Sequence, residues 1–165
     1  MFKKLLNKKL LKNQKGLTLI ELLAVIVILA IVAAIAIPAI GNIIDNSRYN
    51  AVKADAINVL NAAQLYYTDN PGGESDATGD AGAVTTTSIT VAQLQHAKYL
   101  ESRGKIPLTA TVTSGKPHEL TGDSEQKVNG KVVKFTSATI DAINNDKDKG
   151  SKLNNDKVIS KPATP

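Results

Sequence analysis

The most apolar stretch of the chain lies near its N-terminal end. Residues 22–37 are drawn only from alanine, valine, isoleucine and leucine. A helix crosses the hydrocarbon core of a bilayer with about 20 mostly apolar residues, so residues 17–41 predict a membrane-spanning helix. Residues 1–16 carry six lysines and no acidic residue, and the next lysine is Lys53. Because the positively charged flank stays in the cytoplasm, we expect everything after about residue 42 to lie outside.

Residues 42–69 change from a continuous apolar run to an amphipathic pattern. Their apolar residues recur at steps of three and four, which is the spacing of one helix face. The residues on this face are Tyr49, Val52, Ala56, Leu60, Ala63 and Tyr67. Only Pro38 breaks the pattern between residues 18 and 68, so the sequence predicts one long helix. We expect its amphipathic half to pack on a small head domain.

Residues 70–165 contain the signals of a head built from short elements. The breaker Pro71-Gly72-Gly73 and the small polar residues after it predict a surface loop over residues 70–88. Further expected elements are a short helix at residues 90–101, a strand at 109–113 and a hairpin turn at Asn129-Gly130. From residue 144 onward the chain is polar and charged, which predicts a solvated tail.

The tail contains one pattern that resembles a calcium loop. It places Asn144, Asp146, Asp148 and Gly150 at alternate positions. The glycine comes one place late for the EF-hand spacing and no distal glutamate follows, so we interpret the segment as a solvated turn and assign no metal site.

The positive charge of the chain is concentrated in its first residues. The formal net charge is +5, but without residues 1–16 the remaining 14 basic and 15 acidic residues sum to −1. The body therefore offers no basic face for nucleic acid. The absence of cysteine excludes disulfides, thiolate metal sites and cysteine nucleophiles. Two histidines, His96 and His118, are too few for a histidine-rich metal site, and we expect them to be solvated.

One acidic residue, Glu21, stands at the start of the apolar run. A carboxylate near the centre of a membrane helix costs about 2.5–3.5 kcal/mol on insertion scales, and less toward the ends. A secretory signal peptide cleaved after Ala36 has the same basic and apolar layout. Secretion does not require the carboxylate, and the apolar run exceeds an ordinary signal core. Glu21 is therefore a functional candidate.

The residues around Glu21 form a motif. The sequence of residues 15–23, Lys-Gly-Leu-Thr-Leu-Ile-Glu-Leu-Leu, resembles the class III signal of type IV prepilins and of the related pseudopilins. Over residues 15–41 the end of the basic leader, the glycine, the acidic residue and the apolar run follow one another at the spacing of that signal. One position departs from the commonest pattern, because Leu17 stands where the family most often has phenylalanine.

The resemblance implies a processed filament subunit with no cofactor. In that family a membrane peptidase cuts after the position of Gly16 and methylates the new first residue, Leu17. Thr18 and Glu21 then stand at the expected places for filament assembly, where Glu21 pairs with the N-terminal ammonium of a neighbouring subunit. The implied partners are the prepilin peptidase, the inner-membrane pilus assembly machinery, membrane lipid before assembly, and other copies in a helical homo-oligomer.

The implied fold is α+β: a long N-terminal α-helix, the stem of a lollipop, with a small antiparallel β head packed on its outer half. The expected parts are a cleaved leader (1–16), a transmembrane and filament-core half of the helix (17–41), an amphipathic half (42–69) and the head (70–165).

Two features of the helix each allow more than one interpretation. Glu21 could instead pair with the amine of its own Leu17, or favour the positive end of the helix dipole. Pro38 removes a backbone donor, and with Gly41 it predicts a kink or local loosening. That kink serves either packing in a filament or the exit of the span from the bilayer.

The leading functional hypothesis is a pilus subunit that serves adhesion, motility or DNA uptake. The alternatives are a pseudopilin of a secretion or competence system, and a membrane-anchored or secreted binding protein that never polymerises. An enzyme is disfavoured, because the body contains no G-x-S-x-G, H-E-x-x-H or P-loop motif.

Overall fold

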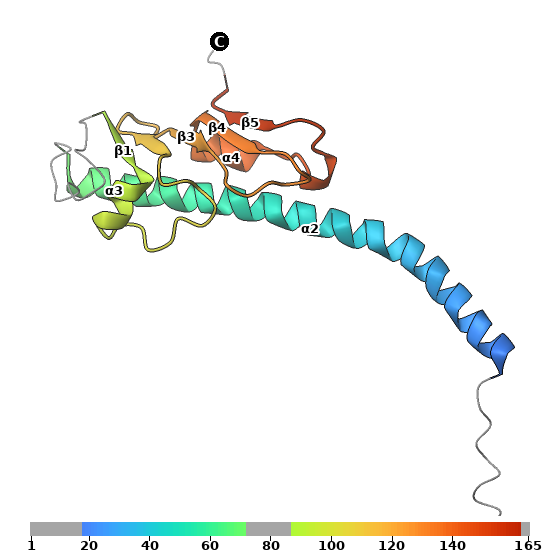
Figure 1. The fold of residues 1–165 in the computed structure, drawn as a ribbon. Coiled ribbons are helices and arrows are strands. Elements are labelled where there is room, and N and C mark those ends of the chain that lie inside the picture. Colours follow the sequence, from blue (N-terminus) through green and yellow to red (C-terminus); the bar gives the residue numbers. More distant parts are fainter. Residues whose placement is uncertain (1–17, 72–86, 163–165) are drawn as a thin grey trace, which may run out of the picture. The chain divides into compact units, whose positions relative to one another are not determined.

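The computed structural model describes residues 18–71 and 87–162 of the chain (Figure 1). The predicted leader, the predicted cleavage position and most of the predicted surface loop over residues 70–88 lie outside the described residues. The chain divides after Ile40 into two units, and each is described by itself.

One long helix, α2 (Leu19–Asp69), contains both of the predicted helical halves. It spans 51 residues and continues through Pro38 without interruption. Asn70 closes the helix, because its backbone N–H and its side-chain amide both donate to the carbonyl of Tyr66. The single helix that the sequence predicts over residues 18–68 is therefore confirmed.

The head contains a five-stranded sheet. Its strands are β1 (Ser88–Thr90), β2 (Thr111–Thr113), β3 (Leu120–Asp123), β4 (Val133–Ala138) and β5 (Lys157–Ser160). They lie in the sheet in chain order. Neighbouring strands from β1 to β4 are antiparallel, whereas β5 runs parallel to β4. A parallel pair requires a crossover, which α4 (Ile140–Asn145) and the 3-10 helix η1 (Gly150–Lys152) supply.

The short helices of the head begin at side-chain caps. In α3 (Val91–His96) the Thr90 hydroxyl accepts from the N–H of Gln93 at 3.2 Å. The Gln93 side chain in turn accepts from the N–H of Thr90 at 2.7 Å. In α4 the Thr139 hydroxyl accepts from the N–H of Ala142. These bonds satisfy N–H groups that the first turn of a helix leaves free.

The core of the head lies between the sheet and the second half of α2. The buried helix residues are Tyr49, Val52, Ala56, Val59, Leu60, Ala62, Ala63 and Tyr66. The helix face was expected to include Tyr67, but Tyr67 is only half-buried, and its hydroxyl donates to the carbonyl of Val112 at 3.0 Å. Tyr66 follows the buried residues Ala62 and Ala63 by four and three positions, so the buried face of the helix continues through Tyr66 instead of Tyr67.

The expected α+β architecture is confirmed, and the structure corrects several details of the head. The helix predicted over residues 90–101 ends at His96, because Lys98 takes a left-handed φ of 62°. The strand predicted over residues 109–113 is limited to β2, and β3 was not expected. The sheet is not wholly antiparallel. The tail predicted to be solvated contains α4 residues, η1 and β5, because its apolar residues pair with and pack on β4.

The turn predicted at Asn129-Gly130 is present. Both residues have left-handed φ values, 49° and 74°, as a two-residue hairpin turn requires. The arms pair only once, as a bridge between Val128 and Lys131. The two arms do not continue as a paired ladder, because β4, which follows the turn, pairs with β3 and β5 instead.

Candidate functional site

Thr18 and Glu21 form a reciprocal cap at the start of α2. The Oε2 atom of Glu21 accepts from the backbone N–H and from the hydroxyl of Thr18, both at 2.9 Å. The N–H of Glu21 donates to the Thr18 hydroxyl at 3.3 Å. This arrangement is a capping box. The structure therefore brings together two of the residues predicted for assembly, whereas Gly16 and Leu17 lie outside the described residues.

This cap was not predicted from the sequence. Its signal is a threonine three residues before a glutamate at the start of an apolar run, which is the sequence signature of a helix N-terminus. The cap gives the Glu21 carboxylate a partner within its own chain. It leaves the carboxylate exposed, so the same group remains accessible to a second donor.

The apolar half of α2 leaves its side chains uncovered. Sixteen large apolar residues between Leu19 and Ile44 are exposed, with exposed fractions from 44% to 84%. The most apolar 18-residue window has a mean hydropathy of 3.1, and none of it is buried. The helix is long and apolar enough to cross a membrane. Soluble proteins rarely expose a continuous apolar surface of this extent, so lipid or other protein must cover it.

Pro38 and Gly41 both lie inside the continuous helix. A Cβ atom added at Gly41 would meet no atom within 4 Å, so no packing contact requires glycine there. Pro38 lacks the N–H that an uninterrupted ladder of hydrogen bonds would use. The predicted kink or loosening stays a prediction.

Replacing Gly41 by alanine should stabilise this part of the helix by about 1 kcal/mol, because alanine is the better helix former and the site is uncrowded. Hydrogen exchange of the amides around position 41, measured on the detergent-solubilised full chain, should slow about fivefold. The reverse change at a neighbouring position, Ala39→Gly, should accelerate the exchange. Equal exchange rates in the wild-type chain and both variants would contradict a local weakness of the helix around Gly41.

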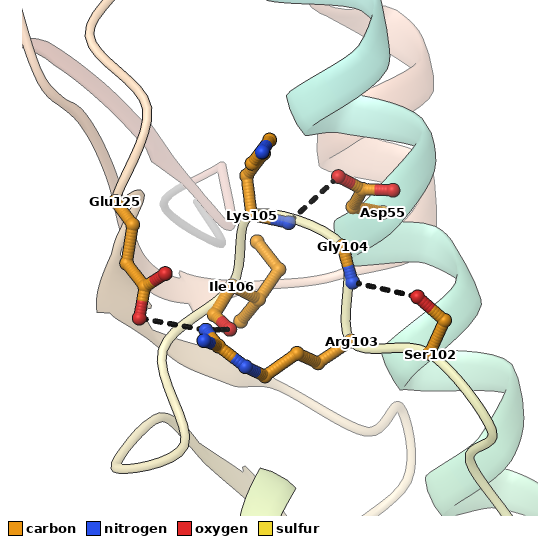
Figure 2. Close-up of polar contacts among 7 residues, drawn as sticks. All are labelled: Asp55, Ser102, Arg103, Gly104, Lys105, Ile106 and Glu125. Carbon is orange, nitrogen blue, oxygen red and sulfur yellow. Dashed lines mark hydrogen bonds and ion pairs between the residues drawn. The ribbon is translucent and has the colours of Figure 1, made fainter.

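Asp55 fastens a loop of the head to α2. Its Oδ2 atom accepts from the backbone N–H of Lys105 at 2.9 Å, as Figure 2 shows. The adjacent Gly104 has a left-handed φ of 57°, and a Cβ atom there would collide with the Asp55 carboxylate. On the other side of the loop, Arg103 donates to Glu125 Oε1 at 2.6 Å. The loop is therefore held between the helix and the connection from β3 to β4.

The change Gly104→Ala should lower the free energy of unfolding by more than left-handed strain alone, which is about 1–2 kcal/mol. The matched control is Gly130→Ala, because Gly130 has a similar φ of 74° but no atom within 4 Å of a Cβ. Denaturant unfolding of the full chain in detergent measures both variants. The amount by which Gly104→Ala lowers the free energy of unfolding more than Gly130→Ala does measures the crowding by Asp55. Equal losses in the two variants would show that Asp55 does not anchor the loop.

Lys157 ties β5 to the crossover segment. Its ammonium group lies 2.8 Å from an Asp146 carboxylate oxygen and 2.6 Å from an Asp148 carboxylate oxygen. Burial opposes ionisation of Asp146, but hydrogen bonds from Lys157 and from the N–H of Asp148 outweigh it and lower the pKa of Asp146. Burial also opposes the charge of Lys157, yet its two carboxylate partners raise the pKa of Lys157. Asp146 and Asp148, which the sequence predicted to lie in a solvated turn, thus bind the ammonium group of Lys157.

These opposite pKa shifts define a pH window. The lowered pKa of Asp146 gives stability that is full above about pH 4 and lost as the pH falls through the folded-state value. The raised pKa of Lys157 gives stability that is full below about pH 10 and lost as the pH rises through the folded-state value. Lys157→Met should cost about 1.5–3 kcal/mol at pH 7. Denaturation curves at pH 7 and pH 2 should show this cost shrinking in acid, and a constant cost would refute the assignment.

The histidines lie apart from these clusters. His96 is exposed, as expected. The expectation is wrong for His118, which is half-buried and stacks on the ring of Tyr67 with 5.2 Å between centroids. Within residues 18–71 and 87–162, no group of three or more histidine, aspartate or glutamate side chains is placed to hold a metal ion.

Comparison with known proteins identifies the N-terminal segment. Residues 11–37 match the prokaryotic N-terminal methylation motif, which is the class III signal of type IV pilins and pseudopilins. The match contains Gly16, Leu17 and the Thr18–Glu21 cap, and it confirms the resemblance of this segment. No curated protein and no solved structure matches the chain.

Proposed function

We propose that the chain is the structural subunit of a type IV pilus. It is inserted as a single-pass prepilin with a cytoplasmic N-terminus, cleaved after Gly16 and methylated at Leu17. The apolar half of its helix then polymerises into a filament on the cell surface, for adhesion, motility or DNA uptake. The observation that carries this proposal is the uncovered apolar surface of residues 19–44, which lies in register with the methylation motif.

The physical reasoning begins with the leader. Each of its six lysines contributes about 1 kcal/mol of attraction to an anionic membrane surface, so the uncut chain stays in the bilayer. Cleavage after Gly16 removes all six. The sixteen exposed apolar side chains still favour a dry environment by roughly 1.5 kcal/mol each, or roughly 24 kcal/mol in total, which prevents release into water.

Lipid and a bundle of other helices are almost equally apolar, so the hydrophobic effect alone does not choose between them. Glu21 supplies the difference in this proposal. In lipid its carboxylate is costly, whereas in a filament the ammonium group created at Leu17 of a neighbouring copy offsets its charge. Pairing at a fixed place on each helix also sets the axial register of the copies.

The experiment that tests the proposal is the intact mass of the protein sheared from the surface of its own cells. We expect a chain that begins at Leu17 and carries one additional methyl group. A chain that begins after Ala36 would establish ordinary secretion instead. The full 17.4 kDa chain would establish an uncut membrane anchor. Either of these two masses overturns the proposal.

A further inference from the structure

Acidic and basic residues are segregated along the body of the chain. Residues 54–97 contain five acidic residues and neither lysine nor arginine. Residues 98–165 contain 12 basic and 8 acidic residues. Three of the five acids fall within residues 72–86, whose sequence contains Glu74, Asp76 and Asp80 and no base. We call residues 72–86 the acidic segment.

A basic hollow lies on the crossover between β4 and β5. It has a volume of about 290 Å³, and three exposed lysines, Lys147, Lys149 and Lys152, line it together with Asp148 and Leu153. We call it the lysine hollow. Among the described residues, none forms an ion pair or a hydrogen bond with the ammonium groups of these three lysines.

The other charges near the lysine hollow do not neutralise it. Asp148 and the neighbouring Asp146 share the ammonium group of Lys157, so these three groups together leave one negative charge. Asp156 pairs with Lys134 at 3.4 Å. Three free lysines against one net negative charge leave the hollow positive, which favours an anionic occupant.

The lysine hollow lies far along α2 from Pro71, the residue after which the acidic segment begins. Lys149 lines a neighbouring hollow with Asn46, on α2 near the start of the head. The acidic segment begins after Pro71, beyond the end of α2. The 24 residues of helix between Asn46 and Asn70 span about 36 Å at 1.5 Å per residue. Even a fully extended chain carries Asp76 no more than about 18 Å from Pro71, so Asp76 cannot reach the lysine hollow of its own copy.

We propose that the lysine hollow of one copy receives the acidic segment of a second copy. The occupant is a segment of this same chain because it offers three carboxylates without a base, the charge complement of three unpaired lysines. The contact joins two different surfaces, as the repeated contacts of a helical filament do. The inference rests on the proposed function and adds to it a second contact, between heads, that salt weakens.

Cysteine pairs give the direct test, because the chain has no cysteine of its own. The full chain is made in its own cells with Lys149→Cys and Asp76→Cys together, and sheared filaments are separated without reductant. A head-to-tail contact should give a ladder of dimers, trimers and longer species. Each single-cysteine chain should give no species beyond a dimer. Filaments without a ladder from the paired variant would overturn the inference and leave the proposed function standing.

Charge reversal supplies the second measurement. Replacing the three lysines of the hollow by glutamate should shorten filaments or reduce their yield, and replacing the three acids by lysine should do the same. Combining both sets in one chain should restore assembly. The ladder of the chain with Lys149→Cys and Asp76→Cys should weaken as ionic strength rises from about 0.1 M to about 1 M, because the Debye length shortens from about 10 Å to about 3 Å.

Two further outcomes would overturn the inference. Charge-reversed lysines that leave the filaments unchanged, but abolish their retention on immobilised polyphosphate, would assign the hollow to an external polyanion. Absence of any filament from the wild-type chain would remove the proposed function, and the contact between heads with it. If the paired-cysteine chain forms filaments that still require Glu21 but gives no ladder, the contact between heads is wrong and the proposed function stands.

Discussion

Cells that express Glu21→Ala should produce few or no filaments, although the chain is still cleaved after Gly16. The change removes a charge that, in the proposed assembly, binds an ammonium group in a dry environment. A hydrogen bond to a charged group contributes about 1.5–3 kcal/mol, so the equilibrium for adding each subunit should fall about 10- to 150-fold. The measurement is the amount of protein in the sheared fraction, with the mass of the membrane-bound protein as proof of cleavage.

Two control variants separate the charge of Glu21 from its role in the cap. Glutamine also serves at the third helical position of a capping box, so Glu21→Gln keeps the cap and removes the charge. Thr18→Ala removes the cap and keeps the charge. We expect Glu21→Gln to lose assembly and Thr18→Ala to retain it. The opposite result would show that Glu21 only starts the helix, and the pairing between copies would then have to be abandoned.

The largest loss of stability should follow from Gly150→Ala. A Cβ atom at this position would collide with the backbone carbonyl of Asp45 and lie 2.8 Å from both Tyr49 Cβ and Val128 Cγ1. The helix carbonyl cannot move without breaking α2, and overpacking ordinarily costs about 1–3 kcal/mol. We expect a cost at or above the top of that range, measured as the free energy of unfolding of the full chain in detergent.

Gly115 provides the matched control for this change. It lies between β2 and β3, and a Cβ atom there would meet no atom within 4 Å. Gly115→Ala should therefore change the free energy of unfolding by less than about 0.5 kcal/mol. If the two alanine variants unfold alike, the segment around η1 does not pack on α2 as described.

The sequence predicted the helix well because its signals are local. Sixteen consecutive aliphatic residues and a regular amphipathic pattern define α2 without any knowledge of the rest of the chain. The sequence pattern predicted Tyr67 on the buried face, whereas Tyr66 is the buried residue, and both positions continue the spacing of the preceding turns. Only the packing of the sheet selects between them, and no local spacing contains that information.

The tail of the head could not be predicted in the same way. β5 is four residues long and its exposed Val158 alternates with buried Ile159, which is too short a pattern to indicate a strand. Its partner β4 lies more than twenty positions earlier and parallel to it. The pairing of Lys157 with Asp146 and Asp148 depends on that crossover. A short polar segment therefore looked solvated, although tertiary contacts fix it.

β5 is the last element of the described fold in chain order, so it is also the last strand of the sheet to be synthesised. Lys157 stands 136 positions after Glu21. At about 5–20 residues per second, the start of α2 is therefore made about 7–27 s before the last strand of the sheet. Until that strand arrives, β4 has an open edge, and Asp146 and Asp148 lack their ammonium partner. A chain that stops before residue 157 therefore lacks both the last strand of the sheet and the ammonium group that Asp146 and Asp148 bind.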